Sequence, residues 1–180
     1  RFQKFIPQIV SLLNIENKWE VEVSSLLSQI GLVTMPSEIL DKKFKGEKLD
    51  IDLENIFNQH PQVGKSLLKN IPRMENITES IFFQFHPYKS ENKYDICGEQ
   101  LPIASRILYV LNKFDSYVTT GMSFEDAYDE LKKYEEEFDP NVLIALDATI
   151  AGIYQNLKLI STNIDEVEPG VVAAADIVDK

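Results

Sequence analysis

The chain has 180 residues, of which 44% are hydrophobic, and 18 Lys and Arg oppose 29 Asp and Glu, for a net charge of -11. A chain of this length supports one compact core, and its acidic surface would repel phosphate backbones, which argues against nucleic acid as a direct partner. The single cysteine, Cys97, excludes an internal disulfide, and no apolar run approaches the roughly twenty residues of a membrane helix. Together with a start at Arg1 and no signal-peptide pattern, these features predict a cytoplasmic fragment of a longer protein.

Scarce glycine and proline, with apolar residues at helical spacing, predict an all-α fold. The first helix runs through residues 5–13 with Pro7 in its opening turn. The second carries apolar residues from Trp19 to Ile30, with Trp19 packed in the first helical pair, and Gly31 is placed to end it in a left-handed conformation.

The remaining elements alternate with polar segments. The charged stretch 41–50 is predicted to be a loop, and 88–100 is a polar, aperiodic loop of a length typical of a lid or binding loop. Ser123 is expected to cap one helix, and Asp139 followed by Pro140 another. Further helices are predicted over 53–57, 61–71, 77–85 and 103–118.

Five segments together resemble a known domain. "LLSQIGLVTMPSEIL", "QHPQVGKSLL", "FHPYKSENKY", "GEQLPIASRILYVLNKFDSYV" and "FDPNVLIAL" stand in the order found in an HD-GYP domain, over roughly residues 1–157. This is a bacterial branch of the HD phosphohydrolases, whose active members hydrolyse cyclic di-GMP at a bi- or trinuclear metal site. The resemblance implies a bundle of about seven helices over residues 1–160, followed at 161–180 by the start of a short, irregular C-terminal segment.

Hydrolysis of a phosphodiester needs a particular set of side chains. Two metals about 3.5–4 Å apart neutralise the phosphate and lower the pKa of the attacking water, and a bridging carboxylate offsets their repulsion. Histidines and further carboxylates complete the coordination shell. Neutral amides and hydroxyls replace such ligands poorly.

The resemblance implies that this chain has lost most of that set. No catalytic residue is expected, because uncharged side chains occupy the family's functional positions: Ser28, Gln29, Leu32, Phe85 and Asn112. His60 and His86, both histidines of the chain, match ligand positions that are kept. We expect no cofactor, although two imidazoles could weakly hold a single Fe, Mn or Zn ion. In the other interpretation they are partly buried polar residues that remain in a pocket which no longer binds metal.

Other polar residues have two interpretations each. Tyr94 matches the tyrosine of the GYP triplet, and with Lys93 it could contact a nucleotide or simply lie in a solvated loop. Arg106 could bind phosphate or pair with an acidic neighbour. Asp115 could replace the lost carboxylate or have a structural role, and Glu54 is expected on the surface.

These observations predict a catalytically inactive HD-GYP-like signalling domain from a bacterial response regulator or sensor protein. It would act by protein-protein interaction or by sensing cyclic di-GMP. The alternative is a metal-dependent cyclic di-GMP phosphodiesterase with an altered metal site, so enzymatic activity stays open although the lost carboxylates argue against it. The expected partners are signalling proteins, among them a diguanylate cyclase or a receiver domain in the same chain, and a second copy in a homodimer.

Overall fold

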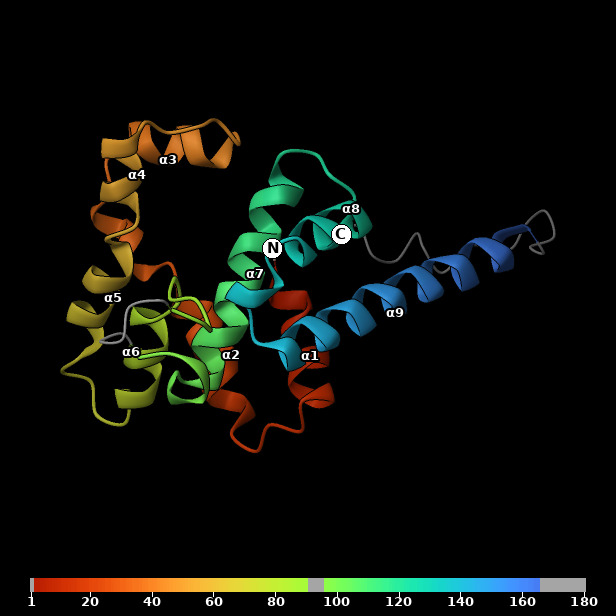
Figure 1. The fold of residues 1–180 in the computed structure, drawn as a ribbon, viewed down its shortest axis with the longest axis horizontal. Helices are drawn as coiled ribbons and strands as arrows, with labels where there is room; N and C mark the ends of the chain where they lie inside the picture. Colours follow the sequence, from red (N-terminus) through yellow and green to blue (C-terminus); the bar gives the residue numbers. More distant parts are fainter. Residues whose placement is uncertain (1, 91–95, 166–180) are drawn as a thin grey trace.

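The computed structural model describes residues 2–90 and 96–165, and within these ranges it consists of helices, turns and loops without a strand (Figure 1). The all-α prediction is therefore confirmed. The described residues form nine α-helices and four short 3-10 helices, where about seven helices were expected. None of these helices is long and apolar enough to cross a membrane.

The first two helices differ from the prediction at two residues. Gly31 does not end α2 in a left-handed conformation, because α2 stops at Leu27 and Gly31 belongs to the 3-10 helix η2. Trp19 is 50% exposed, since it stands two residues before the buried Val21 and so on another side of α2. The bounds here are η1 Phe2–Lys4, α1 Ile6–Leu12, α2 Lys18–Leu27 and η2 Ile30–Thr34.

The predicted charged loop over 41–50 is wrong in its first half, which belongs to α3, Ser37–Phe44. Ile39 anchors this helix by burial, and Glu38 and Lys42 form an i,i+4 ion pair of 3.0 Å along it. α4, Ile51–Phe57, begins where the Asp50 carboxylate accepts a hydrogen bond from the Leu53 N–H, yet it buries none of its own side chains. α5 and α6 follow as His60–Leu68 and Glu75–Phe82.

The last two helices, α8 and α9, begin as their sequence signals predict. Ser123 Oγ accepts a hydrogen bond from the Asp126 N–H at the start of α8, Phe124–Lys132, and Asp139 does so from the Asn141 N–H at α9, Pro140–Asp165. Residues 161–165 continue α9, so the expectation of an irregular segment is wrong for them, and 166–180 lie outside the described residues. The remaining bounds are η3 Gly98–Gln100, α7 Ile103–Thr119 and η4 Glu135–Glu137.

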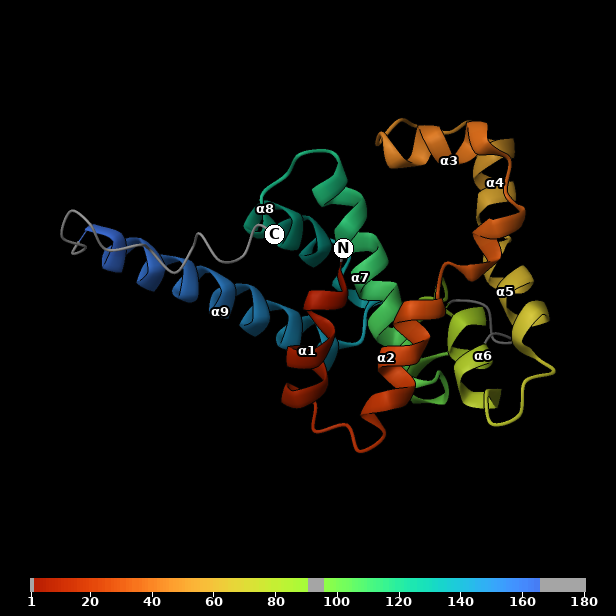
Figure 2. The same cartoon turned by 180° about the vertical axis from the view of Figure 1, so that it is seen from behind.

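The hydrophobic core has two parts. Figure 2 shows the helices that contribute to them from behind. The larger cluster joins α1, α7, α8 and α9, with Phe114 at 1% exposure among its bulkiest members. The smaller one joins α2, α5 and α6 through Leu68, Ile77 and Ile81. α2 and α6 also contact α7, which links the two parts, whereas α3 and α4 extend away from the bundle. We refer to residues 37–57 as the α3–α4 arm.

Candidate functional site

The buried side chain of Gln84 joins two positions that the sequence had singled out separately. Its Nε2 donates to the carbonyl oxygens of Ser28, at 2.9 Å, and Ile81, at 3.0 Å. Its Oε1 accepts a hydrogen bond from Asn112 Nδ2 at 3.4 Å. Gln84 is 1% exposed. Its amide is therefore the buried point at which three elements meet: the end of α2, the end of α6 and the middle of α7. The fold thus brings Ser28 and Asn112 into a single site.

This network is electrically neutral. The Ser28 hydroxyl is already used, since it donates to the Ser25 carbonyl oxygen at 2.9 Å within α2. Gln29, the other half of the expected His-Asp pair, is exposed at the start of η2. Leu32, at the position where the resemblance implies a lysine, is buried. The network is therefore built from neutral hydrogen bonds beside apolar packing, which is the arrangement that burial favours.

Gly31 determines how closely this segment approaches α5. A Cβ at this position would lie 1.9 Å from the His60 carbonyl oxygen and 2.9 Å from the Gly64 nitrogen. Only a residue without a side chain allows two backbones to come this close. This close contact explains the glycine. The contact also brings the segment that contains Ser28 and Gln29 close to His60.

His60 occupies an aromatic enclosure at the start of α5. It is 2% exposed, and its ring makes edge-to-face contacts with Phe57 at 5.1 Å and Phe85 at 5.3 Å between centroids. Nδ1 lies 2.8 Å from the Phe57 carbonyl oxygen, so Nδ1 carries the hydrogen and Nε2 keeps its lone pair. Nε2 is buried without a hydrogen-bond partner. Burial lowers the pKa of His60, and the bond to Phe57 only partly opposes this, so the imidazole is neutral near pH 7.

His86 has different neighbours. Its ring lies 4.9 Å from the Phe83 ring and 5.9 Å from the Phe82 ring, both contributed by the end of α6. Phe85, the residue before it, contacts His60 instead. His60 and His86 thus each lie against aromatic rings.

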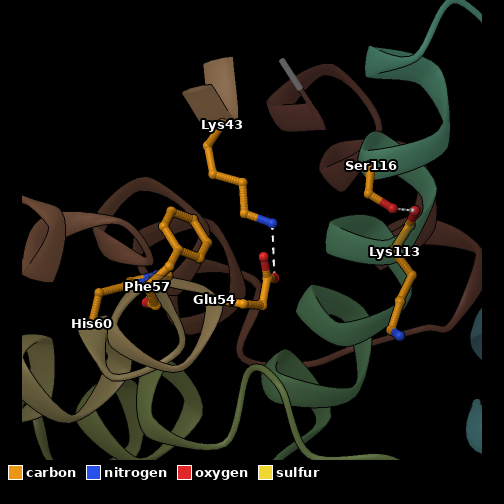
Figure 3. A network of polar contacts seen from close by, with 6 residues as sticks. All are labelled: Lys43, Glu54, Phe57, His60, Lys113 and Ser116. Atoms are coloured by element: carbon orange, nitrogen blue, oxygen red, sulfur yellow. Dashed lines mark hydrogen bonds and ion pairs between the residues drawn. The ribbon is translucent and has the colours of Figure 1, made fainter. Parts of the chain in front are cut away.

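A lysine from the α3–α4 arm lies beside this enclosure (Figure 3). Lys43 Nζ donates to Glu54 Oε1 at 2.8 Å and lies 4.9 Å from the centroid of the Phe57 ring, which in turn contacts His60. Glu54, expected on the surface, is half-buried through this pair. Figure 3 also shows Lys113 and Ser116 of α7, where Ser116 Oγ donates to the Lys113 carbonyl oxygen at 2.6 Å. Lys43, which lies beside His60's enclosure, is therefore already matched by a carboxylate.

The side chains at this site do not fit the bridged metal centre that the resemblance implies. Among the residues that the structure describes, no group of three or more His, Cys, Asp or Glu could hold a metal ion. Asp115, one turn beyond Asn112 on α7, accepts a hydrogen bond from Thr119 Oγ1 at 3.5 Å. A bridging carboxylate is what two metals most require, and Gln29 and Asn112 cannot supply one.

The remaining predicted residues divide into two groups. Tyr94 and Lys93 lie outside the described residues. Arg106 takes one of its two expected roles, because its Nη1 lies 2.6 Å from Asp139 Oδ2 in a pair whose carboxylate is 1% exposed. Asp139 also caps α9, so this ion pair fixes α7 to the start of the last helix.

The structure adds two residues to the site that the sequence analysis had missed. Gln84 is the hydrogen-bonding centre of the network, and Phe57 contacts both His60 and Lys43. Gln84 directly precedes the Phe85–His86 step, and a polar residue between phenylalanines was a signal that could have identified it. Phe57 had been assigned only to a helical apolar pattern.

A family model described as HD domain matches residues 1–142, from α1 to the start of α9. The match covers more than half of the chain and every site residue discussed above. No curated protein was found that matches the chain.

Proposed function

Because the chain belongs to the HD domain family, we propose that it is a catalytically inactive signalling domain of the HD-GYP type that acts by binding. In this proposal it works in the bacterial cytoplasm, as part of a response regulator or sensor protein. A protein partner, such as a receiver domain or a diguanylate cyclase, is the main ligand, and cyclic di-GMP is the second one to be tested.

The observation that carries the proposal is the Gln84 network. Gln84 donates to the Ser28 backbone carbonyl and accepts from the Asn112 amide, and the resemblance implies a histidine ligand at Ser28 and a terminal carboxylate at Asn112 in a working site. Metal-hydroxide catalysis depends on cations that lower the pKa of water, and these cations need anionic ligands. A buried, hydrogen-bonded amide offers none, and it stabilises the fold instead.

Exposed apolar side chains on the α3–α4 arm support binding to a protein. Phe44 is 65% exposed and Ile51 is 80% exposed, and α4 has no fully buried side chain. Apolar groups gathered on an exposed element are typical of interaction surfaces. Replacing Phe44 and Ile51 by serine should weaken binding of the partner domain, whereas the same change at Leu26, 61% exposed on α2, should not.

The test of inactivity is a cyclic di-GMP hydrolysis assay with Mn²⁺ or Fe²⁺, combined with elemental analysis of the purified protein. We expect no turnover above the rate without protein. Metal-dependent turnover that disappears in the His60→Ala, His86→Ala double variant would refute the proposal. Calorimetry with cyclic di-GMP then separates the two binding modes. A lack of heat at high ligand concentration would exclude the nucleotide as a ligand and leave the protein partner.

One observation favours the alternative of an altered metal site. His60 Nε2 is a buried nitrogen with a free lone pair, which is the form of imidazole that binds transition metals. A single nitrogen holds a metal weakly, and two metals need a bridge. Titration with Zn²⁺ and Mn²⁺ tests this alternative, because His60→Phe should abolish any tight binding if His60 is a ligand.

A further inference from the structure

The α3–α4 arm is attached to the bundle by few contacts. Ile39, at 3% exposure, is its one buried residue. Among the described residues, neither part of the hydrophobic core includes a side chain of the arm. Segments that bury little apolar surface open locally at a lower free energy than the core. The arm can therefore leave the bundle while both parts of the core stay intact.

Contacts within the arm join its two helices. Lys43 Nζ of α3 donates to Glu54 Oε1 of α4 at 2.8 Å and lies 4.9 Å from the centroid of the Phe57 ring. The Gly46 N–H donates to the Lys43 carbonyl oxygen at 3.1 Å and so closes the turn after α3. These contacts favour motion of the arm as one unit over separate motions of α3 and α4.

The turn after α3 meets the bundle again at the end of α7. Gly46 has a φ of 73°, and a Cβ added there would lie 3.3 Å from the Thr119 carbonyl oxygen and 3.4 Å from Thr119 Cγ2. Thr119 is the last residue of α7, and Figure 1 shows this end of α3 on the side of α7. The arm thus leaves the bundle between η2 and α5 and touches it a second time at its tip.

One side of α7 connects this contact to the Gln84 network. Asn112 and Thr119 are two helical turns apart, so both lie on the same side of α7. Asn112 Nδ2 donates to Gln84 Oε1 at 3.4 Å. At the other end of the arm, the centroid of the Phe57 ring lies 5.1 Å from that of His60. The two contacts of the arm therefore flank the site that the Gln84 network and His60 form.

We propose that the α3–α4 arm is a strap with a closed and an open state. In the closed state, which the structure describes, Gly46 rests on Thr119 and Phe57 covers His60. In the open state the arm has turned as one unit about its two connections to the bundle, and both contacts are released. Opening gives a ligand access to His60 and to the polar side of α7. The strap controls access to the site whether or not the site is catalytic, so it does not depend on the proposed function.

Hydrogen–deuterium exchange of the 180-residue chain tests for the open state. We expect the arm amides to exchange faster than those of the buried part of α7, and Thr119→Phe to speed arm exchange about tenfold further, because the larger side chain displaces Gly46. Two controls should exchange like the wild type: Thr119→Val keeps the Cγ2 methyl group, and Thr120→Phe places the same ring at an exposed neighbour. Arm amides as slow as those of the core, or unchanged arm exchange in Thr119→Phe, would overturn the proposal.

A disulfide at the tip tests whether opening requires the release of Gly46. In a Cys97→Ser background, Gly46→Cys and Thr119→Cys together should form this bond, because a Cβ at position 46 lies 3.4 Å from Thr119 Cγ2 and a disulfide needs Cβ atoms about 3.5–4.5 Å apart. The oxidised variant should show about tenfold slower arm exchange than the same variant after reduction, which is the control for a side chain at this positive φ. Failure to cross-link, or equal arm exchange in both forms, would refute the strap.

Discussion

Replacing Gly31 by alanine should destabilise the protein more than any other single methyl group added to the site. The new Cβ would lie 1.9 Å from the His60 carbonyl oxygen, 2.8 Å from its carbon and 2.9 Å from the Gly64 nitrogen. All three atoms belong to the backbone of α5, so no side-chain rotation relieves the clash. The 3-10 helix η2 must move away from α5 by about 1 Å to restore a normal contact.

The size of the effect follows from that movement. Overpacking by a methyl group usually costs about 1–3 kcal/mol, and the upper part of this range applies where only backbone can move. Separation of η2 from α5 also loosens Ile30, which packs against the smaller core cluster. We therefore expect a loss of about 3 kcal/mol in the free energy of unfolding for Gly31→Ala.

Urea denaturation followed by circular dichroism measures this loss, as a fall of about 1–2 M in the unfolding midpoint. Gly64→Ala is the matched control across the same contact. Its Cβ would meet two side-chain methyl groups first, Ile81 Cγ2 at 3.2 Å and Ile30 Cγ2 at 3.4 Å, and the Gly31 nitrogen at an ordinary contact distance of 3.7 Å, and alanine favours the helix that contains it. We expect it to stay within about 1 kcal/mol of the wild type. The reasoning fails if Gly31→Ala unfolds within about 0.5 kcal/mol of the wild type.

Three further changes test the site and its supports. Gln84→Leu should cost about 1–3 kcal/mol in urea unfolding, because it leaves the buried Ser28 carbonyl without its partner; an unchanged midpoint would mean that the network does not stabilise the fold. Asp139→Ala should lower the free energy of unfolding by about 3–5 kcal/mol, since it leaves the Arg106 charge mostly buried and unpaired and removes the cap of α9. Adding Arg106→Met should recover part of this loss, and no recovery would contradict a role for the ion pair. The lowered pKa of His60 means that the unfolded chain binds its proton first, so stability is full above the ordinary pKa of 6.5 and falls as the pH decreases below it. His60→Phe should remove this dependence between pH 5 and 8, and an equal pH dependence in both proteins would show that other groups cause it.

Helix positions were predictable from the sequence wherever a local signal coincided with a long apolar pattern. Ser123 and Asp139 act as caps in the structure because capping depends on residues two or three positions away, which the sequence shows directly. The long apolar face of α7 was equally clear. In contrast, α3 was missed because four of its eight residues are charged, two acids and two lysines. They obscure an apolar pattern in which Ile39 is the one buried residue.

Contacts between distant segments could not be derived in the same way. Gly31 was interpreted as a helix end, a frequent local role of glycine, whereas its actual reason is the approach of α5 about thirty residues later. Gln84 was not identified, because its partners Ser28 and Asn112 are 56 and 28 residues away. The uncharged side chains of Ser28, Gln29 and Asn112 were visible in the sequence. Which side chain occupies the space between them was not.

The lack of buried side chains in α4 has a consequence for how the protein opens. An element without a fully buried side chain can detach at a lower cost than unfolding of the core, so its amide hydrogens exchange through local rather than global opening. α4 ends at Phe57, whose ring covers one edge of His60 and whose carbonyl oxygen accepts the imidazole hydrogen. Each opening of α4 therefore uncovers His60, and solvent reaches this buried imidazole along the least anchored helix of the arm.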